Sequence, residues 1–373
     1  MHIICKTENL AKGVNLVSKI STSRGSLPIL SNILLKAQDG DIILSATDLE
    51  LGIKTQILGK VEIGGSITIP ARLLNEFVNS CNDEQLEITL EGESVKLASQ
   101  KYTAHLNGLD ASEFPLIPEI KGDAFVEIES DIFRNALAQV AFAASRDETR
   151  PILTGVCFIF KGKEIKLVAT DSYRLVEKII SSNKEFSEEL AVIIPVSTIL
   201  EALRIITPEE PLIGMFLTDN QVMFVIGKTT IISRVIEGKF PDYEQIIPKK
   251  FSTTTSIDKS ELINALKLTN LFARESANNV RLKLKKDILE LIAIAPQVGD
   301  NIAKLKTKTE GDDMEIAFNT KYLLDALAQI HREKIVINTN RPSSGSERTD
   351  PGMILGEGET DYRSIIMPLR MDE

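Results

Sequence analysis

The sequence predicts an α+β protein built from three successive copies of one domain. Three observations support this fold class. Sequence motifs return at a nearly constant interval, an amphipathic helical pattern opens each copy, and alternating apolar and polar residues follow it. A chain of 373 residues with 43% hydrophobic content is long enough to bury several cores of ordinary size. We therefore expect several domains and not one compact body.

Two pairs of motifs in the first two copies establish the repeat. The segment DIILSATDLELGIKT around Asp48 returns as EIKLVATDSYRLVEK around Asp171, 123 residues later. The proline that ends a predicted strand occurs as Pro70 in SITIPARLL and again as Pro195 in AVIIPVSTIL, 125 residues later. Their order is the same in both copies, so the repeat covers a whole domain and not a short solenoid turn.

A third motif and a fainter third copy complete the pattern. The segment EFPLIP at Pro115 returns as KFPDYEQIIP at Pro241, 126 residues later. In the third copy MEIAFNTKYLL has Asn319 where the earlier copies have proline, and the Thr-Asp pair is missing from DILELIAIAP. Polar joins separate the copies. We place the domains at residues 1–122, 123–250 and 251–373.

Each copy contains the same elements in the same order. The opening helix shows apolar residues at helical spacing, such as Leu10 and Val14 in the first copy. Alternation at Leu49, Leu51 and Ile53 then predicts a strand. A second helix follows the proline motif, and more strands close the copy. We expect two helices per copy, packed on antiparallel sheets.

Charge and cysteine content restrict the function classes. The formal net charge of −10 disfavours binding of nucleic acid through overall charge, so any such contact needs a local basic face. Cys5, Cys81 and Cys157 show neither a disulfide framework nor zinc-ligand spacing. The sequence shows no signal peptide and no apolar stretch of membrane-spanning length. These features predict a soluble protein of the reducing cytoplasm.

Candidate catalytic groups are few. Asp48 and Asp171 occupy equivalent places in successive copies, which favours a turn or cap role over a catalytic pair. His2, His105 and His331 have no partner at triad or metal-ligand spacing. Phosphate-binding glycine motifs are also missing from the sequence. We expect no catalytic residue, no metal and no cofactor, although a hydrolase using the two aspartates is a possible rival.

The opening helices carry basic and amide side chains opposite their apolar stripes. In the first copy these are Lys12, Asn15 and Lys19. A solvated helix face is the simple interpretation. Recurrence in all three copies favours a basic lining that contacts phosphates without reading sequence. Further candidates are Arg134, Asn135, Lys259, Asn264, Lys267, Arg72 and Arg204.

The ordered motifs resemble one known family over essentially the whole chain. LPILSNILL, ATDLEL, FPLIP, VATDSYRL, FPDY and the terminal IIMPLRM are similar to the bacterial DNA polymerase III beta subunits, the sliding clamps. The resemblance implies that two three-domain protomers close head to tail into a ring around duplex DNA. It also implies partners: the replicative polymerase, a clamp loader that uses its own ATP, and repair polymerases.

The resemblance further implies a hydrophobic groove that receives short peptide motifs of these partners. An exposed apolar cleft with a few polar groups suits peptide docking. Packing of the tail as a last strand of its own domain is an alternative that is compatible with the groove. The implied lining is Leu153, Thr170, Ser172, Tyr173, Arg174, Leu175, Pro241, Ile246, Met353, Ile365, Ile366, Met367, Pro368, Leu369, Arg370 and Met371.

This chain departs from the family pattern in the groove. It has Ser172 and Tyr173 where members commonly have Gly-His, and Gln245 where they have arginine. A polar stretch, NRPSSGSERTDPG, precedes Met353, and the chain extends to Glu373. Partner motif and affinity are therefore expected to differ from those of other members.

Two further residue sets follow from the resemblance. The implied DNA contacts are Lys12, Arg24, Arg72, Arg146 and Arg150, each of which could also be an ordinary surface residue. The implied head-to-tail dimer contacts are Leu106, Leu271 and Phe272, for which core packing is the alternative. A scaffold that never closes on DNA is the main rival to a clamp.

Overall fold

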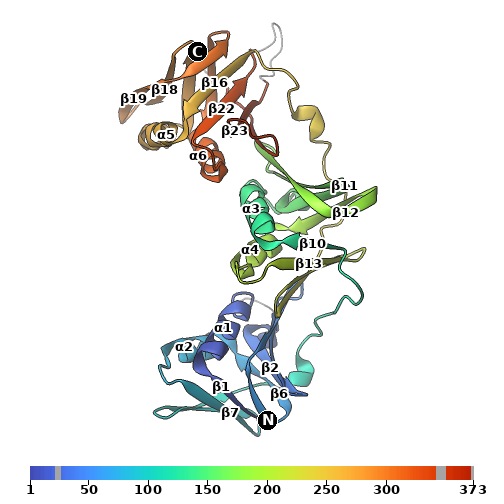
Figure 1. The fold of residues 1–373 in the computed structure, drawn as a ribbon. Coiled ribbons are helices and arrows are strands. Elements are labelled where there is room, and N and C mark those ends of the chain that lie inside the picture. Colours follow the sequence, from blue (N-terminus) through green and yellow to red (C-terminus); the bar gives the residue numbers. More distant parts are fainter. Residues whose placement is uncertain (22–26, 342–349, 371–373) are drawn as a thin grey trace. The chain divides into compact units, whose positions relative to one another are not determined.

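The computed structural model describes residues 1–21, 27–341 and 350–370 (Figure 1). The chain divides into two compact units, which we call unit 1 (residues 1–131 with 197–235) and unit 2 (residues 132–196 with 236–373). Both consist of helices and antiparallel strands, so the α+β prediction is confirmed. The middle predicted domain, 123–250, is shared between the units. The three domain boundaries stay a prediction.

Unit 1 contains two antiparallel sheets. The first has the strand order β5-β1-β7-β8-β9 and the second the order β10-β13-β14-β15-β4-β3-β2-β6. In the second sheet β15 pairs with β4, Ser233 lying opposite Leu51, so strands of the first two copies form one continuous sheet. The strands are β1 (His2–Lys6), β2 (Asn32–Gln38), β3 (Asp41–Thr47), β4 (Leu51–Ile57), β5 (Gly59–Ile63), β6 (Gly65–Pro70), β7 (Gln85–Glu91), β8 (Ser94–Ala98), β9 (Thr103–Asn107), β10 (Val126–Glu129), β13 (Leu212–Leu217), β14 (Gln221–Ile226) and β15 (Thr229–Arg234).

Helices α1 (Thr7–Val17) and α2 (Ala71–Ser80) pack side by side in unit 1. Helix α1 lies very close to the sheet, since a Cβ atom added at Gly13 would come within 2.4 Å of Ile57. The Asn15 side chain exchanges hydrogen bonds with Asn75 and Asn79 of α2. Asn15 thus joins two helices and is not free on a solvated face.

A third helix, α4 (Val196–Ile205), is fixed to the end of α1. The Arg204 guanidinium donates hydrogen bonds to the carbonyl oxygens of Asn15 at 3.2 Å and Leu16 at 2.6 Å. It also pairs with Glu201 of its own helix. Arg204 therefore uses its donors inside unit 1, which differs from the basic-face role suggested by the sequence.

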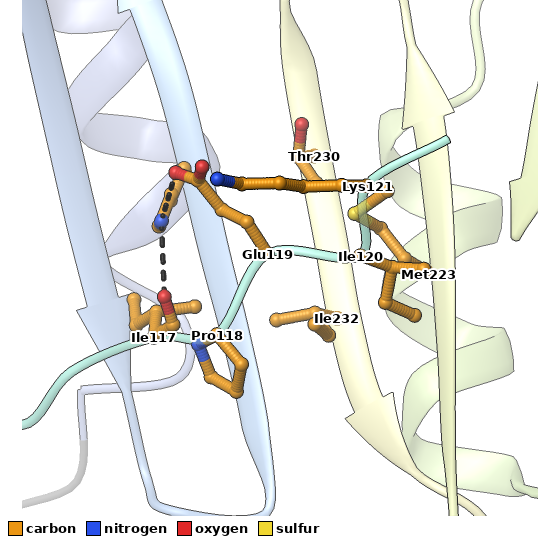
Figure 2. Close-up of a pocket in the computed structure, with 9 residues that line it drawn as sticks. Ile117, Pro118, Glu119, Ile120, Lys121, Met223, Thr230 and Ile232 are labelled. Atoms are coloured by element: carbon orange, nitrogen blue, oxygen red, sulfur yellow. Dashed lines mark hydrogen bonds and ion pairs between the residues drawn. The ribbon is translucent and has the colours of Figure 1, made fainter. Parts of the chain in front are cut away.

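The segment 114–121 runs across the large sheet of unit 1 (Figure 2). The Lys54 ammonium on β4 donates a hydrogen bond of 3.1 Å to the carbonyl oxygen of Ile117 and pairs with Glu119 at 2.9 Å. Pro118, Met223 and Ile232 line a hollow beside these contacts, together with Lys54 and Glu119. This contact holds the segment against the junction of β4 and β15.

Unit 2 contains the other two sheets. One has the order β11-β12-β24-β23-β22-β16-β20 and the other the order β19-β18-β17-β21. In the first, β12 pairs with β24, Arg174 lying opposite Ile366, so strands of the second and third copies again share one sheet. The strands are β11 (Gly155–Thr170), β12 (Arg174–Pro195), β16 (Thr253–Asp258), β17 (Asn279–Lys285), β18 (Ile288–Ala295), β19 (Gly299–Lys306), β20 (Lys308–Gly311), β21 (Met314–Asn319), β22 (Lys334–Thr339), β23 (Gly352–Gly356) and β24 (Tyr362–Ile366).

The helices associated with unit 2 are α3 (Ser130–Ala141), α5 (Lys259–Ala273) and α6 (Thr320–Gln329). The Asn319 side chain accepts a hydrogen bond of 2.9 Å from the Lys321 backbone N–H and caps α6. Its equivalent Pro70 precedes α2 without a side-chain cap. Asparagine is among the strongest N-cap residues, so the third copy keeps its helix start by a different chemistry.

One strand prediction is wrong at its first residue. Leu51 and Ile53 are buried in β4, as the alternation indicates. Leu49 precedes the strand, is exposed, and has a φ of 81°. It belongs to the turn between β3 and β4, because the Asp48 side chain closes that turn before the strand begins.

Candidate functional site

An apolar cluster lies in unit 2 where β11 and β12 meet β24 and the segment 240–247, and we call it the unit 2 cluster. Leu175, Ile365 and Met353, three of the implied groove residues, belong to it. Leu153 and Ile366 are also buried in unit 2. The full cluster is Cys157, Val168, Leu175, Ile193, Tyr243, Ile247 and Ile365, with Ile152, Ile159, Ile236, Phe240 and Met353 packed against it.

The sequence reasoning missed several members of the unit 2 cluster. Phe240, Tyr243 and Ile247 all lie in the KFPDYEQIIP motif that supplied Pro241 and Ile246. The structure buries Tyr243 and leaves Pro241 and Ile246 exposed. The large apolar residues of that motif were the available signal, since apolar side chains in a connecting segment usually pack on a core.

A buried ionic group fixes the 240–247 segment to the sheet. The Tyr243 hydroxyl donates a hydrogen bond of 2.7 Å to the Glu177 carboxylate on β12. Arg363 on β24 pairs with the other oxygen of Glu177 at 2.6 Å. Glu177 is 1% exposed, and burial together with this acceptor raises the pKa of Tyr243. The tyrosine therefore stays protonated and acts as a donor.

The Thr-Asp motif of the second copy forms a tight turn between β11 and β12. The Asp171 carboxylate accepts hydrogen bonds from the backbone N–H groups of Tyr173 and Arg174, both at 2.9 Å. Ser172 has a φ of 78°, an unusual conformation for a residue with a side chain. Ser172 and Tyr173 are exposed, whereas Thr170 is buried. This confirms the turn role expected for Asp171.

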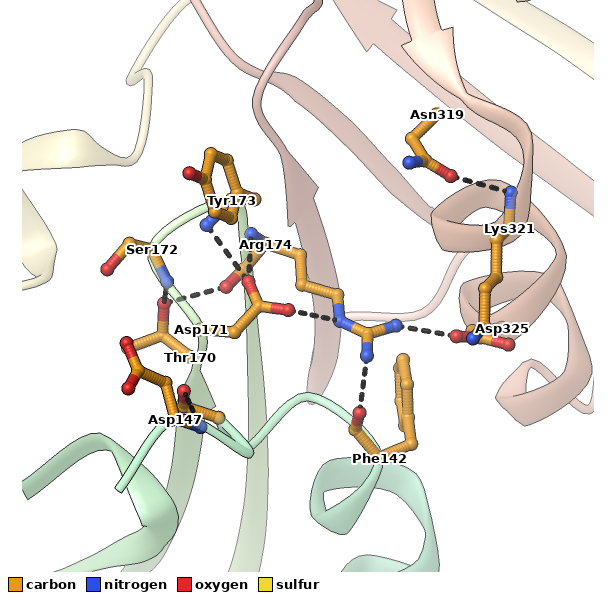
Figure 3. A network of polar contacts seen from close by, with 11 residues as sticks. Phe142, Asp147, Thr170, Asp171, Ser172, Tyr173, Arg174, Asn319, Lys321 and Asp325 are labelled. Carbon is orange, nitrogen blue, oxygen red and sulfur yellow. Dashed lines mark hydrogen bonds and ion pairs between the residues drawn. The ribbon is translucent and has the colours of Figure 1, made fainter. Parts of the chain in front are cut away.

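Arg174 lies in a polar network and not on an open surface (Figure 3). Its guanidinium pairs with Asp171 at 3.0 Å and Asp325 at 2.7 Å, and it donates 2.7 Å to the carbonyl oxygen of Phe142. The rings of Phe142 and Tyr322 lie 5.1 Å and 4.7 Å from its central carbon. Only 11% of the Arg174 side chain is exposed. Its ion pairs with Asp171 and Asp325 connect the turn to α6.

The tail packs as a strand of its own sheet, which was the alternative expected for it. Ile365 and Ile366 are buried in β24. Met367 donates its backbone N–H to Tyr173, and Leu369 donates its own to Ala317. Met367, Pro368 and Leu369 are half-buried, and Arg370 is exposed, so these side chains remain accessible beside the unit 2 cluster. Met371 lies outside the described residues.

Of the five implied DNA contacts, the four that the structure describes are surface side chains. Lys12 pairs with Glu8 at 2.5 Å, and Arg72 pairs with Glu76 at 2.8 Å, each one helical turn apart. Arg146 is exposed. Arg150 is held by Asp147 at 3.4 Å and donates 2.9 Å to the Ser172 hydroxyl. Arg24 lies outside the described residues.

The three implied dimer residues differ in exposure. Leu106 is 5% exposed on β9, where it packs in its own domain as the core alternative expects. Leu271 on α5 is 57% exposed, and Phe272 is half-buried beside it. Helix α5 therefore offers an accessible apolar side chain at Leu271. The Leu106 side chain is buried, and β9, which carries it, is an edge strand of its sheet.

Asp48, His2 and two of the cysteines have structural surroundings and do not form a reactive site. The Asp48 carboxylate accepts the backbone N–H groups of Glu50 and Leu51, the turn role expected for it. His2 lies between Glu62 and Glu87. Burial raises the pKa of Cys5 and of Cys157 to about 12. Across residues 1–21, 27–341 and 350–370 no three His, Cys, Asp or Glu side chains gather as a metal site, and no helix could span a membrane.

The repeated sheets and the accessible apolar site define a multidomain binding protein. Three family descriptions match it in order: the N-terminal domain of DNA polymerase III beta subunit at residues 1–118, the central domain at 127–242 and the C-terminal domain at 244–370. Beta sliding clamps of Staphylococcus epidermidis and Staphylococcus aureus are 30% and 29% identical to it, each over 99% of both chains. The chain therefore belongs to the family of DNA polymerase III beta subunits.

Solved structures agree with this assignment. A DNA polymerase sliding clamp from Bacillus subtilis superposes with a TM-score of 0.94 at 28% identity, covering 100% of both chains. A sliding clamp from Pseudomonas aeruginosa bound to griselimycin superposes with a TM-score of 0.92 at 26% identity, again over 100% of both chains. The family resemblance inferred from the ordered motifs is confirmed.

Proposed function

We propose that this chain is the processivity factor of a DNA polymerase, forming a ring that encircles duplex DNA and performing no catalysis itself. Its family membership over all three sequence copies carries this proposal. A closed ring retains DNA by topology, so its phosphate contacts can stay weak enough to permit sliding. The net charge of −10 is then compatible with DNA binding.

Retention on DNA tests the ring directly. The chain, loaded on nicked circular DNA by a clamp loader with ATP, should remain bound through a gel-filtration column and should leave once the DNA is cut to a linear form. A scaffold that does not encircle DNA would be retained equally on both forms. Equal retention would therefore reject the ring and favour the scaffold.

The proposed DNA contacts are Lys12, Arg24, Arg72, Arg146 and Arg150. The four described ones are surface cations, and long flexible cations suit phosphate contacts that carry no sequence information. Replacing Arg72 and Arg146 by alanine should reduce the salt dependence of DNA binding, because each phosphate contact releases counterions. An unchanged salt slope would exclude both residues from the contact.

The proposed partner site is the surface of the unit 2 cluster near Tyr173, Met367 and Leu369. Apolar side chains that stay partly exposed beside a buried core are suited to receive a short peptide. The replicative polymerase, the clamp loader and repair polymerases are the proposed occupants. Tethering a polymerase to the ring makes its rebinding intramolecular and raises its effective concentration.

The proposed assembly is a head-to-tail homodimer that acts in the cytoplasm. Leu271 and Phe272 of α5 would face the edge strand β9, which carries Leu106, of a second copy. Light scattering should give twice the 41.2 kDa mass of the chain. A mass of one or three chains would require a different closure.

A further inference from the structure

The first copy repeats the backbone of the partner-site turn. The Thr47 hydroxyl donates to the Leu51 carbonyl oxygen at 2.9 Å, as Thr170 does to Arg174 at 2.6 Å. The Asp48 carboxylate accepts the backbone N–H groups of the second and third residues after it, as the Asp171 carboxylate does. Leu49 has a φ of 81° where Ser172 has 78°. Residues 47–51 in unit 1 therefore present their side chains like residues 170–174 in unit 2.

The strand beside this turn is also repeated, but with changed charge. The backbone N–H of Arg234, the last residue of β15, donates a hydrogen bond of 3.1 Å to the Glu50 carbonyl oxygen. In the same way the N–H of Met367, just after β24, donates one of 2.8 Å to the Tyr173 carbonyl oxygen. Arg234 thus stands in the backbone position of Met367. Unit 1 has a cation, paired with Glu50 at 3.8 Å, where the proposed partner site of unit 2 has an apolar side chain.

A cavity borders this repeated turn in unit 1, and we call it the linker cavity. It consists of two neighbouring hollows of about 780 Å³ and 310 Å³, which we call its lobes, and both are lined by residues 115–118 of the FPLIP segment (residues 114–118). Leu49 lines the smaller lobe, Leu116 lines both, and Leu116 is 97% exposed. A leucine held fully in water at a cavity rim is an available apolar contact.

Positive charge gathers along the larger lobe of the linker cavity. Lys36, Lys54 and Lys121 line it together with Glu119 and Asp110. Glu119 is paired with Lys54, and Asp110 caps a short helix through Ser112. Among the described residues neither Lys36 nor Lys121 has an ion pair, although both act on Glu119 through space, and Figure 2 shows Lys121 extending toward it. Three lysines therefore line this lobe together with two acids, which leaves the lobe with an excess of positive charge.

We propose that the linker cavity is a second docking site, which takes a short extended peptide of a partner protein bearing an acidic residue between apolar side chains. The repeated turn supplies the peptide-binding geometry, and this part of the inference rests on the proposed function of the unit 2 cluster. The apolar contacts are Leu49 and Leu116. Lys36 and Lys121 select the acid, so the two sites on one chain bind segments of different charge.

Two peptides test the charge selection on the full-length chain. One is a fluorescein-labelled Gly-Leu-Asp-Leu-Asp-Leu-Gly and the other has lysine in place of both aspartates. Binding is measured by anisotropy in a Met367→Ala variant, which impairs the unit 2 cluster. We expect the acidic peptide to bind, and the double change Lys36→Glu with Lys121→Glu to weaken it by at least about tenfold. The double change to arginine should preserve binding.

Several results would overturn this inference. These are equal affinity for both peptides, unchanged affinity in the charge-reversed variant while its melting curve is normal, or displacement by inorganic phosphate at constant ionic strength. Methyl NMR should place the peptide by shifts at Ile117 and Ile232, and a shift confined to Ile365 would place it at the unit 2 cluster instead. If the linker cavity fails while a polymerase peptide still binds the unit 2 cluster, only this inference is lost.

Discussion

The hydroxyl group of Tyr243 is hydrogen-bonded to the carboxylate of Glu177 at 2.7 Å, and this bond joins the 240–247 segment to β12. Glu177 is a buried acid with two partners from two other segments, Tyr243 and Arg363. Removal of either partner leaves charge or acceptor capacity unpaired inside unit 2, which costs more than a lost surface contact.

Tyr243→Phe should lower the free energy of unfolding by about 1–3 kcal/mol, because a buried acceptor of Glu177 loses its donor. Urea unfolding followed by circular dichroism measures this loss. Tyr173→Phe is the matched control, since the Tyr173 side chain is exposed, and it should leave stability unchanged. Equal stability of both variants would mean that the hydroxyl of Tyr243 does not stabilise the segment.

Arg174→Lys should destabilise unit 2 by about 2 kcal/mol, since an ammonium group cannot reach two carboxylates and a carbonyl oxygen in the fork geometry of a guanidinium. The aromatic contacts with Phe142 and Tyr322 would also weaken. Thermal unfolding measures the effect. Arg72→Lys, at an exposed position of α2 with one acidic partner, should behave like the unchanged chain. A shift as large for Arg72 would contradict the role of the network.

Leu49→Gly should stabilise the chain by about 1 kcal/mol, because a φ of 81° costs a leucine this much and costs glycine little. Leu116→Gly is the control, an exposed leucine without a positive φ. It should lower stability slightly through the added freedom of the unfolded chain. Differential scanning calorimetry should show a higher melting temperature for Leu49→Gly and a lower one for Leu116→Gly. A lower melting temperature for Leu49→Gly would show that the backbone of Leu49 is not strained.

Met367→Ala combined with Leu369→Ala should abolish binding of a polymerase-derived clamp-binding peptide and leave the dimer intact. Both side chains are accessible beside the unit 2 cluster, and neither belongs to the proposed dimer contact. Leu271→Ala should do the reverse, weakening the dimer without changing peptide affinity. Fluorescence anisotropy measures peptide affinity, and light scattering measures dimer formation. Unchanged peptide affinity in the double variant would show that the site assignment is wrong.

Asp83 should give part of the acid sensitivity of unit 1. Its carboxylate accepts 2.6 Å from the Ser99 hydroxyl and 3.0 Å from the Lys101 backbone N–H, and the Ser99 bond in particular lowers its pKa. A lowered folded-state pKa stabilises the fold above the unfolded value, near 3.9, and this contribution is lost as the pH falls through the folded value.

The change Asp83→Asn should therefore reduce the dependence of the urea midpoint on pH below about 4, where the carboxyl group of the unfolded chain titrates. The same variant should be less stable than the unchanged chain at pH 7. Identical pH profiles for the two chains would mean that Asp83 has the same pKa in the folded and unfolded states.

The repeat made much of the fold predictable, because the helix at Leu10 and Val14 and the turns at Asp48 and Asp171 follow from local pattern alone. The sharing of the second copy between two units did not follow. It depends on hydrogen bonds between β15 and β4 and between β12 and β24, which join residues far apart in sequence. Strand pairing of this kind has no signature in either strand by itself.

Part of the unit 2 cluster could be predicted, and its role as a partner site stays a prediction. Leu175, Met353 and Ile365 came from resemblance, and the structure brings them together. No local pattern predicts the ion pair between Arg174 and Asp325, because that contact joins residues 151 positions apart. The Arg204 contacts to α1 could not be predicted either, because they also join residues far apart in sequence.

The pairing of β15 with β4 and of β12 with β24 bears on how the protein can be dissected. A recombinant fragment spanning residues 123–250 would have both of these strands but neither partner. Its exposed edges would offer unpaired backbone groups to other molecules, and such edges promote aggregation. Because each unit is formed by two separate stretches of the chain, no single cut separates the units, and crystallography or binding assays should use the whole chain.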